Sequence, residues 1–147
     1  MFDPRSDIKG LFTDYRVTGT DKYSNTAHVD IYLAEDNPNA TIVREGVIIL
    51  EQPRAVSIDS DIGDNTNYDE IKFDANLFVI RKSHIRDYPS FINSIVNTFQ
   101  STIKTNRSNL SSCSDAKVTN MDSPLVPFDE RKVKFRRVIE ITCWKLA

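Results

Sequence analysis

Two strand-like segments on either side of one amphipathic helix place the strongest constraint on how this chain folds. Residues 71–82 alternate apolar and polar side chains, as a half-buried strand does. Residues 89–105 instead carry apolar side chains three and four positions apart, which is typical of one face of a helix. A second alternating segment, residues 132–146, follows a connector that contains Pro124 and Pro127. A helix between two such strands must cover the sheet that they form, so the pattern predicts an α+β fold.

The expected core faces follow from the two periodicities. The helix presents a wide apolar face: Phe91, Ile92, Ile95, Val96, Phe99 and Ile103. Its first turn contains Pro89, and Asp87 is the candidate N-terminal cap. The first strand places these residues on one face: Ile71, Phe73, Ala75, Leu77 and Val79. The last strand places these on one face: Val133, Phe135, Ile139, Ile141 and Cys143.

The first half of the chain predicts a short helix and several further strands. Helical spacing of apolar residues indicates a helix over residues 4–15, followed by a turn at residues 18–20. Residues 27–34 alternate cleanly. Shorter segments rich in β-branched residues also read as strands: 42–43, 47–50 and 55–59, with a weak strand at 116–121. We therefore expect a single α+β domain over residues 1–147. Its sheet is mostly antiparallel, with a short N-terminal helix and one long helix packed on one face.

Composition narrows the functional classes. Hydrophobic residues make up 39% of the 147 residues and charged residues 27%, as in ordinary globular domains. No uninterrupted apolar run is longer than that from Val47 to Leu50, and the N-terminus lacks the features of a secretory signal, so we expect no membrane association. With 19 basic and 21 acidic residues, the formal net charge of −2 predicts no general attraction to nucleic acid.

Metal, cofactor and catalytic motifs are not recognisable in the sequence. Asp59, Asp61 and Glu70 match positions one, three and twelve of a calcium loop, but Gly63 and Asp64 reverse the order that its turn needs. That segment is better explained as a hairpin tip. The two histidines, His28 and His84, and the two cysteines, Cys113 and Cys143, lack the spacing of a zinc site. We expect reduced cysteines rather than a disulfide, and no enzyme activity.

Two charged clusters are the candidate functional features. The acidic cluster occupies residues 59–70: Asp59, Asp61, Asp64, Asp69 and Glu70. The basic cluster occupies residues 131–137: Arg131, Lys132, Lys134, Arg136 and Arg137. Alternation puts three of these bases, Lys132, Lys134 and Arg136, on one exposed stripe that phosphates could contact. A charged sheet edge that discourages stray pairing, or that meets acidic groups of a neighbouring subunit, explains the stripe better.

Arg137 is the exception in the basic cluster, because alternation places it on the otherwise apolar face. A buried or interfacial guanidinium needs a carboxylate partner, so Arg137 is a candidate subunit contact.

The order of the strand at 73–81, the helix at 89–104 and the end strand at 135–144 resembles the tail terminator (tail-completion) proteins of long-tailed bacterial and archaeal viruses. That family opens with a short helix like residues 4–15. It commonly ends in an aromatic-Arg-apolar-x-apolar strand, as in Phe135-Arg-Arg-Val-Ile. The resemblance rests on this pattern and covers most of the chain in outline.

The resemblance implies a mechanical role in the virion. Such proteins form a hexameric ring that ends tail-tube polymerisation and joins the tail to the head connector, with the tube protein and a neck or head-completion protein as partners. DNA passes through the lumen without specific binding, and assembly takes place in the host cytoplasm. The acidic residues of 59–70 would line the lumen or meet an adjacent ring, because carboxylates repel phosphates. Four bases become candidates for the subunit interface: Lys132, Lys134, Arg136 and Arg137.

Other functions remain open from the sequence alone. Another head–tail connector or tail-tube component would share the same architecture. A small DNA-binding accessory domain would instead use the basic stripe at 131–137, and its affinity for duplex DNA would fall steeply with salt. An enzyme with a dispersed site is the least favoured class, because few reactive groups are present.

Overall fold

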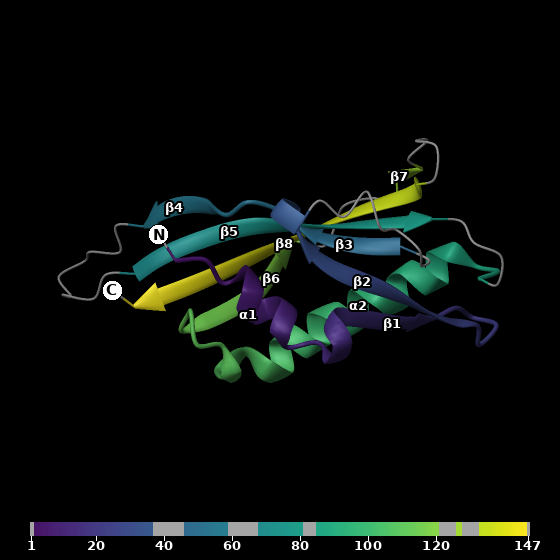
Figure 1. Cartoon of the computed structure of the whole chain (residues 1–147), viewed down its shortest axis with the longest axis horizontal. Helices are drawn as coiled ribbons and strands as arrows, with labels where there is room; N and C mark the ends of the chain where they lie inside the picture. Colours follow the sequence, from purple (N-terminus) through teal and green to yellow (C-terminus); the bar gives the residue numbers. More distant parts are fainter. Residues whose placement is uncertain are drawn as a thin grey trace.

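The structure is a computed structural model that describes residues 2–36, 46–58, 68–80, 85–120, 126–127 and 133–146. Its strands form one sheet in the order β1-β2-β3-β5-β8-β6, with β4 added to β5 and β7 to β8 (Figure 1). The strands are β1 (Arg16–Thr20), β2 (Thr26–Leu33), β3 (Gly46–Leu50), β4 (Arg54–Ile58), β5 (Tyr68–Ile80), β6 (Asp115–Asn120), β7 (Val126–Pro127) and β8 (Val133–Leu146). The helices are α1 (Arg5–Gly10) and α2 (Tyr88–Asn106), with 3₁₀ turns η1 (Thr13–Tyr15), η2 (Ala34–Asp36) and η4 (Arg107–Asn109). This arrangement confirms the expected α+β class.

The pairing between β5 and β8 runs along almost the whole of both strands. It is antiparallel from Tyr68 opposite Leu146 to Val79 opposite Phe135, and the register shifts only before Ile80. Side chains alternate between faces along each strand, so the apolar residues of β5 and β8 meet on one side. The expected face of β5 is confirmed, because Ile71 and every second residue to Val79 are buried. Among the described pairs, β2 with β3 is parallel and the others are antiparallel.

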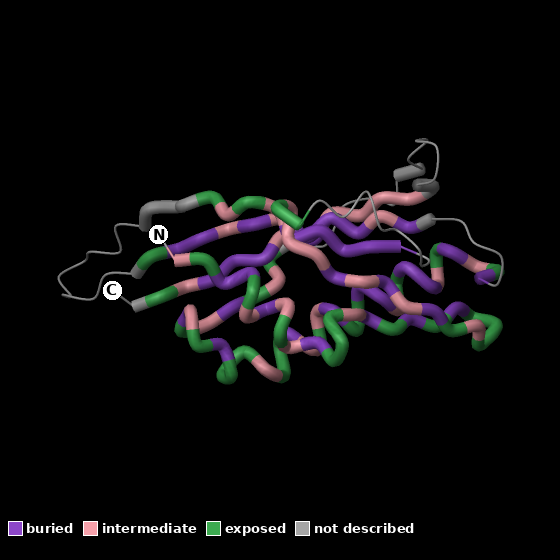
Figure 2. Tube along the Cα trace, in the orientation of Figure 1, coloured by how far each residue is buried: buried purple, intermediate pink, exposed green. Residues whose placement is uncertain are grey.

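Helix α2 covers the apolar face of the sheet as its periodicity predicts. All six residues of the expected helix face are buried, and Phe99 stacks on Phe12, which follows α1, with ring centroids 5.2 Å apart. Buried positions gather where α2 and the strands face each other (Figure 2). Asp87 is the N-cap residue of α2 as expected, but its side chain makes no capping hydrogen bond. The Asp87 carboxylate instead forms an ion pair with Lys22 Nζ at 3.3 Å.

The segment after α1 differs from the sequence prediction. The expected helix over residues 4–15 ends at Gly10, and a 3₁₀ turn with positive φ angles at Asp14 and Tyr15 leads directly into β1. The sequence predicts a turn at residues 18–20, but residues 16–20 form an edge strand. Serines of α2 serve as its outer neighbour: Thr20 N donates to Ser94 Oγ at 3.0 Å and Lys22 N donates to Ser90 Oγ at 2.9 Å. Residues that are distant in the sequence therefore accept from backbone N–H groups for which the local sequence pattern predicts no partner.

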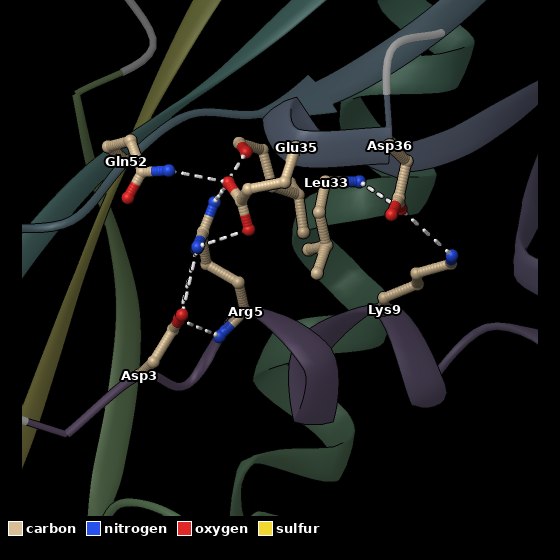
Figure 3. A network of polar contacts seen from close by, with 8 residues as sticks. Asp3, Arg5, Lys9, Leu33, Glu35, Asp36 and Gln52 are labelled. Carbon is tan, nitrogen blue, oxygen red and sulfur yellow. Dashed lines mark hydrogen bonds and ion pairs between the residues drawn. The ribbon is translucent and has the colours of Figure 1, made fainter.

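A buried guanidinium attaches the N-terminal segment to the sheet (Figure 3). Arg5 is only 3% exposed; it donates to both carboxylate oxygens of Asp3 and of Glu35, and to the Leu50 carbonyl at 3.2 Å. Gln52 Nε2 donates to the same Glu35 carboxylate at 2.7 Å. Hydrogen bonds from Arg5 lower the pKa of Asp3 and of Glu35, and the Asp3 carboxylate foremost raises the pKa of Arg5. The network joins α1 to the ends of β2 and β3 through paired charges.

A buried carboxylate joins the β1–β2 turn to the segment before α2. Asp21 is 4% exposed, and its oxygens accept hydrogen bonds from the backbone N–H groups of Tyr23, Asn25 and Arg86, each at 2.9 Å. Burial alone would raise the pKa of Asp21, but these hydrogen bonds outweigh it and hold the pKa well below its usual range. The ionised form is therefore the one that the fold requires.

Gly19 sets how closely α2 approaches β1. A Cβ atom at this position would lie 2.6 Å from Ile95 Cδ1 and 3.2 Å from Phe91 Cε2, and both side chains are buried. We expect Gly19→Ala to lower the free energy of unfolding by about 1–3 kcal/mol through overpacking, as measured by urea denaturation. Gly10→Ala is the matched control, because nothing lies within 4 Å of its Cβ position. It should raise stability by about 0.5–1 kcal/mol. Equal effects of both substitutions would contradict this packing.

The lowered pKa of Asp21 predicts a specific acid dependence of stability. A carboxylate with a depressed folded-state pKa contributes stability that is present above the unfolded pKa of about 3.9 and is lost as pH falls towards the folded value. We expect Asp21→Asn to be less stable at pH 7 and to show a flatter decline below about pH 4. Chemical denaturation between pH 2 and pH 7 measures both. Asp14→Asn, at an exposed site, should retain the wild-type pH dependence.

Candidate functional site on the outer face of the sheet

The face of the sheet opposite α2, called the outer face below, carries most of the described charged side chains of the central strands. Its residues on β5 and β8 follow from the register: Glu70, Lys72, Asp74, Asn76 and Phe78, opposite Trp144, Thr142, Glu140, Val138 and Arg136. Burial varies along this face, with Glu70, Asn76 and Thr142 buried and the others more exposed (Figure 2). The outer face therefore combines shielded polar groups with accessible charges.

A ladder of alternating charges connects four strands across the outer face. Arg54 of β4 lies between Asp74 of β5, at 3.3 Å, and Glu140 of β8, at 3.4 Å. The Glu140 carboxylate also lies 3.9 Å from Lys72 Nζ and accepts a hydrogen bond from Thr119 Oγ1 of β6 at 3.0 Å. These side chains remain partly exposed, so each pair contributes less than about 1 kcal/mol. Their combined effect is a face on which bases and acids are matched within one subunit.

A buried amide extends this polar system towards the start of β8. Asn76 is 6% exposed; its Nδ2 donates to Glu51 Oε1 at 3.0 Å, and its Oδ1 accepts from Arg136 Nη2 at 3.1 Å. The Arg136 guanidinium also lies over the Phe78 ring, 5.9 Å from its centroid. Arg136 is therefore held along the sheet by neighbours of its own chain.

Arg137 lies on the other face, towards α2. It is opposite Leu77 in the register, and its Nη1 donates to Asn93 Oδ1 of α2 at 3.0 Å. This contact is to an amide oxygen of the same chain. Arg136 and Arg137 thus serve opposite faces of β8. The predicted sheet edge is wrong at Arg136, since β8 there lies between β5 and β7.

The other predicted site residues fall into two groups. Asp59, Asp61, Asp64, Arg131 and Lys132 lie outside the described residues, as does His84. Asp69 and Glu70 lie within β5 rather than in a hairpin tip, paired with β4 on one side and β8 on the other. Asp69 is exposed and Glu70 is buried, on opposite faces. Lys134 is part of β8 and lies at the register shift, between the Val79–Phe135 and Ile80–Val133 pairs.

Within 2–36, 46–58, 68–80, 85–120, 126–127 and 133–146, no three His, Cys, Asp or Glu side chains gather in a way that would hold a metal ion. In the same ranges, no helix has the length and apolarity needed to cross a membrane. His28 Nδ1 lies 2.8 Å from Thr18 Oγ1 in an exposed cross-strand pair.

Sequence reasoning missed the residues of the outer-face ladder, namely Arg54, Lys72, Asp74, Thr119 and Glu140, and the adjoining Asn76 amide. The only signal for them was their place on the polar side of alternating strands. That signal shows which face a residue occupies and does not show which strand will be its neighbour. No family model, curated protein or solved structure matches this chain.

The Asn76 amide predicts unequal costs for two similar substitutions. Asn76→Ala removes a buried acceptor from Arg136, whose Nε already has no hydrogen-bond partner among the described residues. We expect a loss of about 1–3 kcal/mol in the free energy of unfolding. Asn93→Ala also removes an amide that accepts from an arginine, but at an exposed helix position, so its loss should stay within about 0.5 kcal/mol. Thermal and urea unfolding compare the two variants, and a larger loss for Asn93→Ala would contradict the assignment.

Proposed function

We propose that this chain is a structural virion protein related in role to the tail terminators of long-tailed viruses. Its copies form a ring of six subunits at the neck–tail junction, end tail-tube polymerisation and join the tail to the head connector. The observation that supports this most is the arrangement of β5, α2 and β8 around one core, preceded by a short N-terminal helix. This arrangement is the pattern on which the resemblance to tail terminators rests. A shared fold alone does not determine function, so the charges and contacts on the surface must also be consistent with the proposed role.

The outer face suits a subunit with a structural role. Its ladder links β4, β5 and β8 through paired charges and β6 through the Thr119 hydroxyl. These contacts stiffen the sheet across its strands. Two bases, Arg54 and Lys72, are compensated by the acids Asp74 and Glu140. A compensated face has little attraction for a phosphate backbone, as passage of DNA through a ring requires.

Contacts of Arg136 favour this proposal over a DNA-binding accessory domain. A phosphate would have to displace both the Asn76 amide and the Phe78 ring from the guanidinium. We therefore place the basic residues of 132–137 at a subunit boundary rather than on nucleic acid: Lys132, Lys134, Arg136 and Arg137. In the proposed ring, Asp59, Asp61 and Asp64 face the lumen or the adjacent ring. The partners are further copies of the chain, the tail tube protein and a neck or head-completion protein, in the virion and in the host cytoplasm during assembly.

Native mass spectrometry of the purified chain tests the ring. We expect a closed species of six subunits that persists at high salt, because packing rather than exposed ion pairs would hold a stable ring. A strict monomer at the highest attainable concentration would overturn the proposal. Salt-sensitive binding of that monomer to duplex DNA would transfer support to the DNA-binding alternative.

A pair of charge reversals tests the predicted interface. The double variant Lys132→Glu with Lys134→Glu should raise the dissociation constant of the ring at least about tenfold, since like charges would meet at the boundary. Lys104→Glu with Lys117→Glu is the matched control, as it makes the same change of charge at two exposed positions elsewhere. Sedimentation velocity measures both. If both variants assembled equally well, Lys132 and Lys134 would not lie at the interface. The existence of the ring would still be tested by native mass spectrometry.

A further inference from the structure

Two buried thiols from distant parts of the sequence meet in the core. Cys113 lies in the loop between η4 and β6, and Cys143 lies in β8. Both are free, both are buried, and both belong to the main hydrophobic cluster. The pairing of β6 with β8 brings them together, because Ala116 is opposite Cys143 and Ser114 N donates to the Trp144 carbonyl at 2.7 Å.

The two thiols are neighbours in the core, and their surroundings differ. The neighbouring Cys113 thiol and burial raise the pKa of Cys143, so Cys143 keeps its proton. The neighbouring Cys143 thiol lowers the pKa of Cys113, against the opposing influence of burial and of the Asp7 and Asp115 carboxylates. Cys113 is therefore the sulfur that ionises first and attacks first.

The loop that carries Cys113 is attached to α1 through one carboxylate. Asp7 Oδ2 accepts hydrogen bonds from Ser112 N at 2.8 Å and from Ser111 Oγ at 3.1 Å. Ser111 and Ser114 are exposed, so the loop lies at the surface and Cys113 is one residue layer below it. Release of the Asp7 contacts would let a small oxidant reach Cys113 without unfolding of the sheet.

We propose that Cys113 and Cys143 form a reversible dithiol–disulfide pair, with Cys113 as the attacking sulfur and Cys143 as the resolving sulfur. The oxidant is a low-molecular-weight disulfide such as oxidised glutathione. The Cys113 thiolate attacks one of its sulfurs, which forms a mixed disulfide and releases one thiolate. Cys143 then loses its proton and attacks the Cys113 sulfur, which forms the intramolecular bond and releases the second thiolate. Two protein thiols are oxidised, and one glutathione disulfide is reduced to two thiols.

The position of the bond predicts its effect on the molecule. It would join the loop after α2 to β8 and close a covalent ring of about 30 residues, which restricts the unfolded chain. Thiols that are already neighbours in the core need little movement to bond, so the folded state should tolerate the link. The inference does not rest on the proposed ring, since it concerns a single subunit.

Incubation of the purified chain with oxidised glutathione tests the pair. The expected product is lighter by two hydrogen atoms, has no thiol that an alkylating reagent modifies after denaturation, and yields linked tryptic peptides 108–117 and 138–145. Its melting temperature should rise by on the order of 10 °C relative to the reduced chain. Retention of two alkylatable thiols, stable glutathione adducts on both cysteines, or links only between separate chains would each overturn the proposal.

Cys113→Ser supplies the control and tests the assigned roles. This variant should keep Cys143 unreactive in the folded state, with an alkylation rate at least about tenfold below that of Cys113 in the wild-type chain, which is read from tryptic peptide 108–117. Its melting temperature should not respond to oxidised glutathione. Fast modification of Cys143 in folded Cys113→Ser would reverse the roles of the two sulfurs. The linked peptides of the wild-type chain provide the decisive measurement even if Cys113→Ser folds poorly.

Discussion

The antiparallel pairing of β5 with β8 is the constraint on which the rest of the structure depends. β5 also pairs with β3 and β4, and β8 also pairs with β6 and β7, so these two strands organise most of the sheet. A slip of one residue would move Phe73 and Ile141 to the outer face and carry Lys72 and Glu140 into the core. The energetic difference between these registers is large, because one buries apolar surface and the other buries charge. One register therefore determines both the core and the outer face.

Two buried charges join the remaining segments to this sheet, and they are satisfied in different ways. Arg5 is paired with carboxylates, including Glu35 thirty positions away. Asp21 faces backbone N–H groups, including that of Arg86 sixty-five positions away. A buried charge that lost its partners would be costly, so both contacts specify where α1 and the β1–β2 turn must lie. The molecule thus combines a non-directional apolar core with a few directional contacts between distant segments.

The outer face and the thiol pair give the molecule two chemically distinct regions. On the outer face, acids and bases of β4, β5 and β8 neutralise each other, and the Thr119 hydroxyl of β6 joins them by a hydrogen bond. At the β6 side of the core, Cys113 and Cys143 are buried free thiols brought near each other by strand pairing. A subunit that acts within a larger assembly needs the first property, and the second would add a covalent link without altering the sheet.

The sequence by itself determined the elements whose pattern is local. Period-two alternation identified β2, β5 and β8, and the 3.6-residue period identified α2 and its buried face, because each signal lies within one segment. Only the tertiary structure decided that residues 16–20 form a strand, since β2 pairs with it and serines of α2 accept from the backbone N–H groups of Thr20 at its end and of Lys22 in the following turn. It also decided that β8 is an interior strand and that Arg136 and Arg137 contact amides of their own chain. Those outcomes depend on groups brought together by folding, and a one-dimensional pattern shows which side a residue faces without showing what will lie beside it.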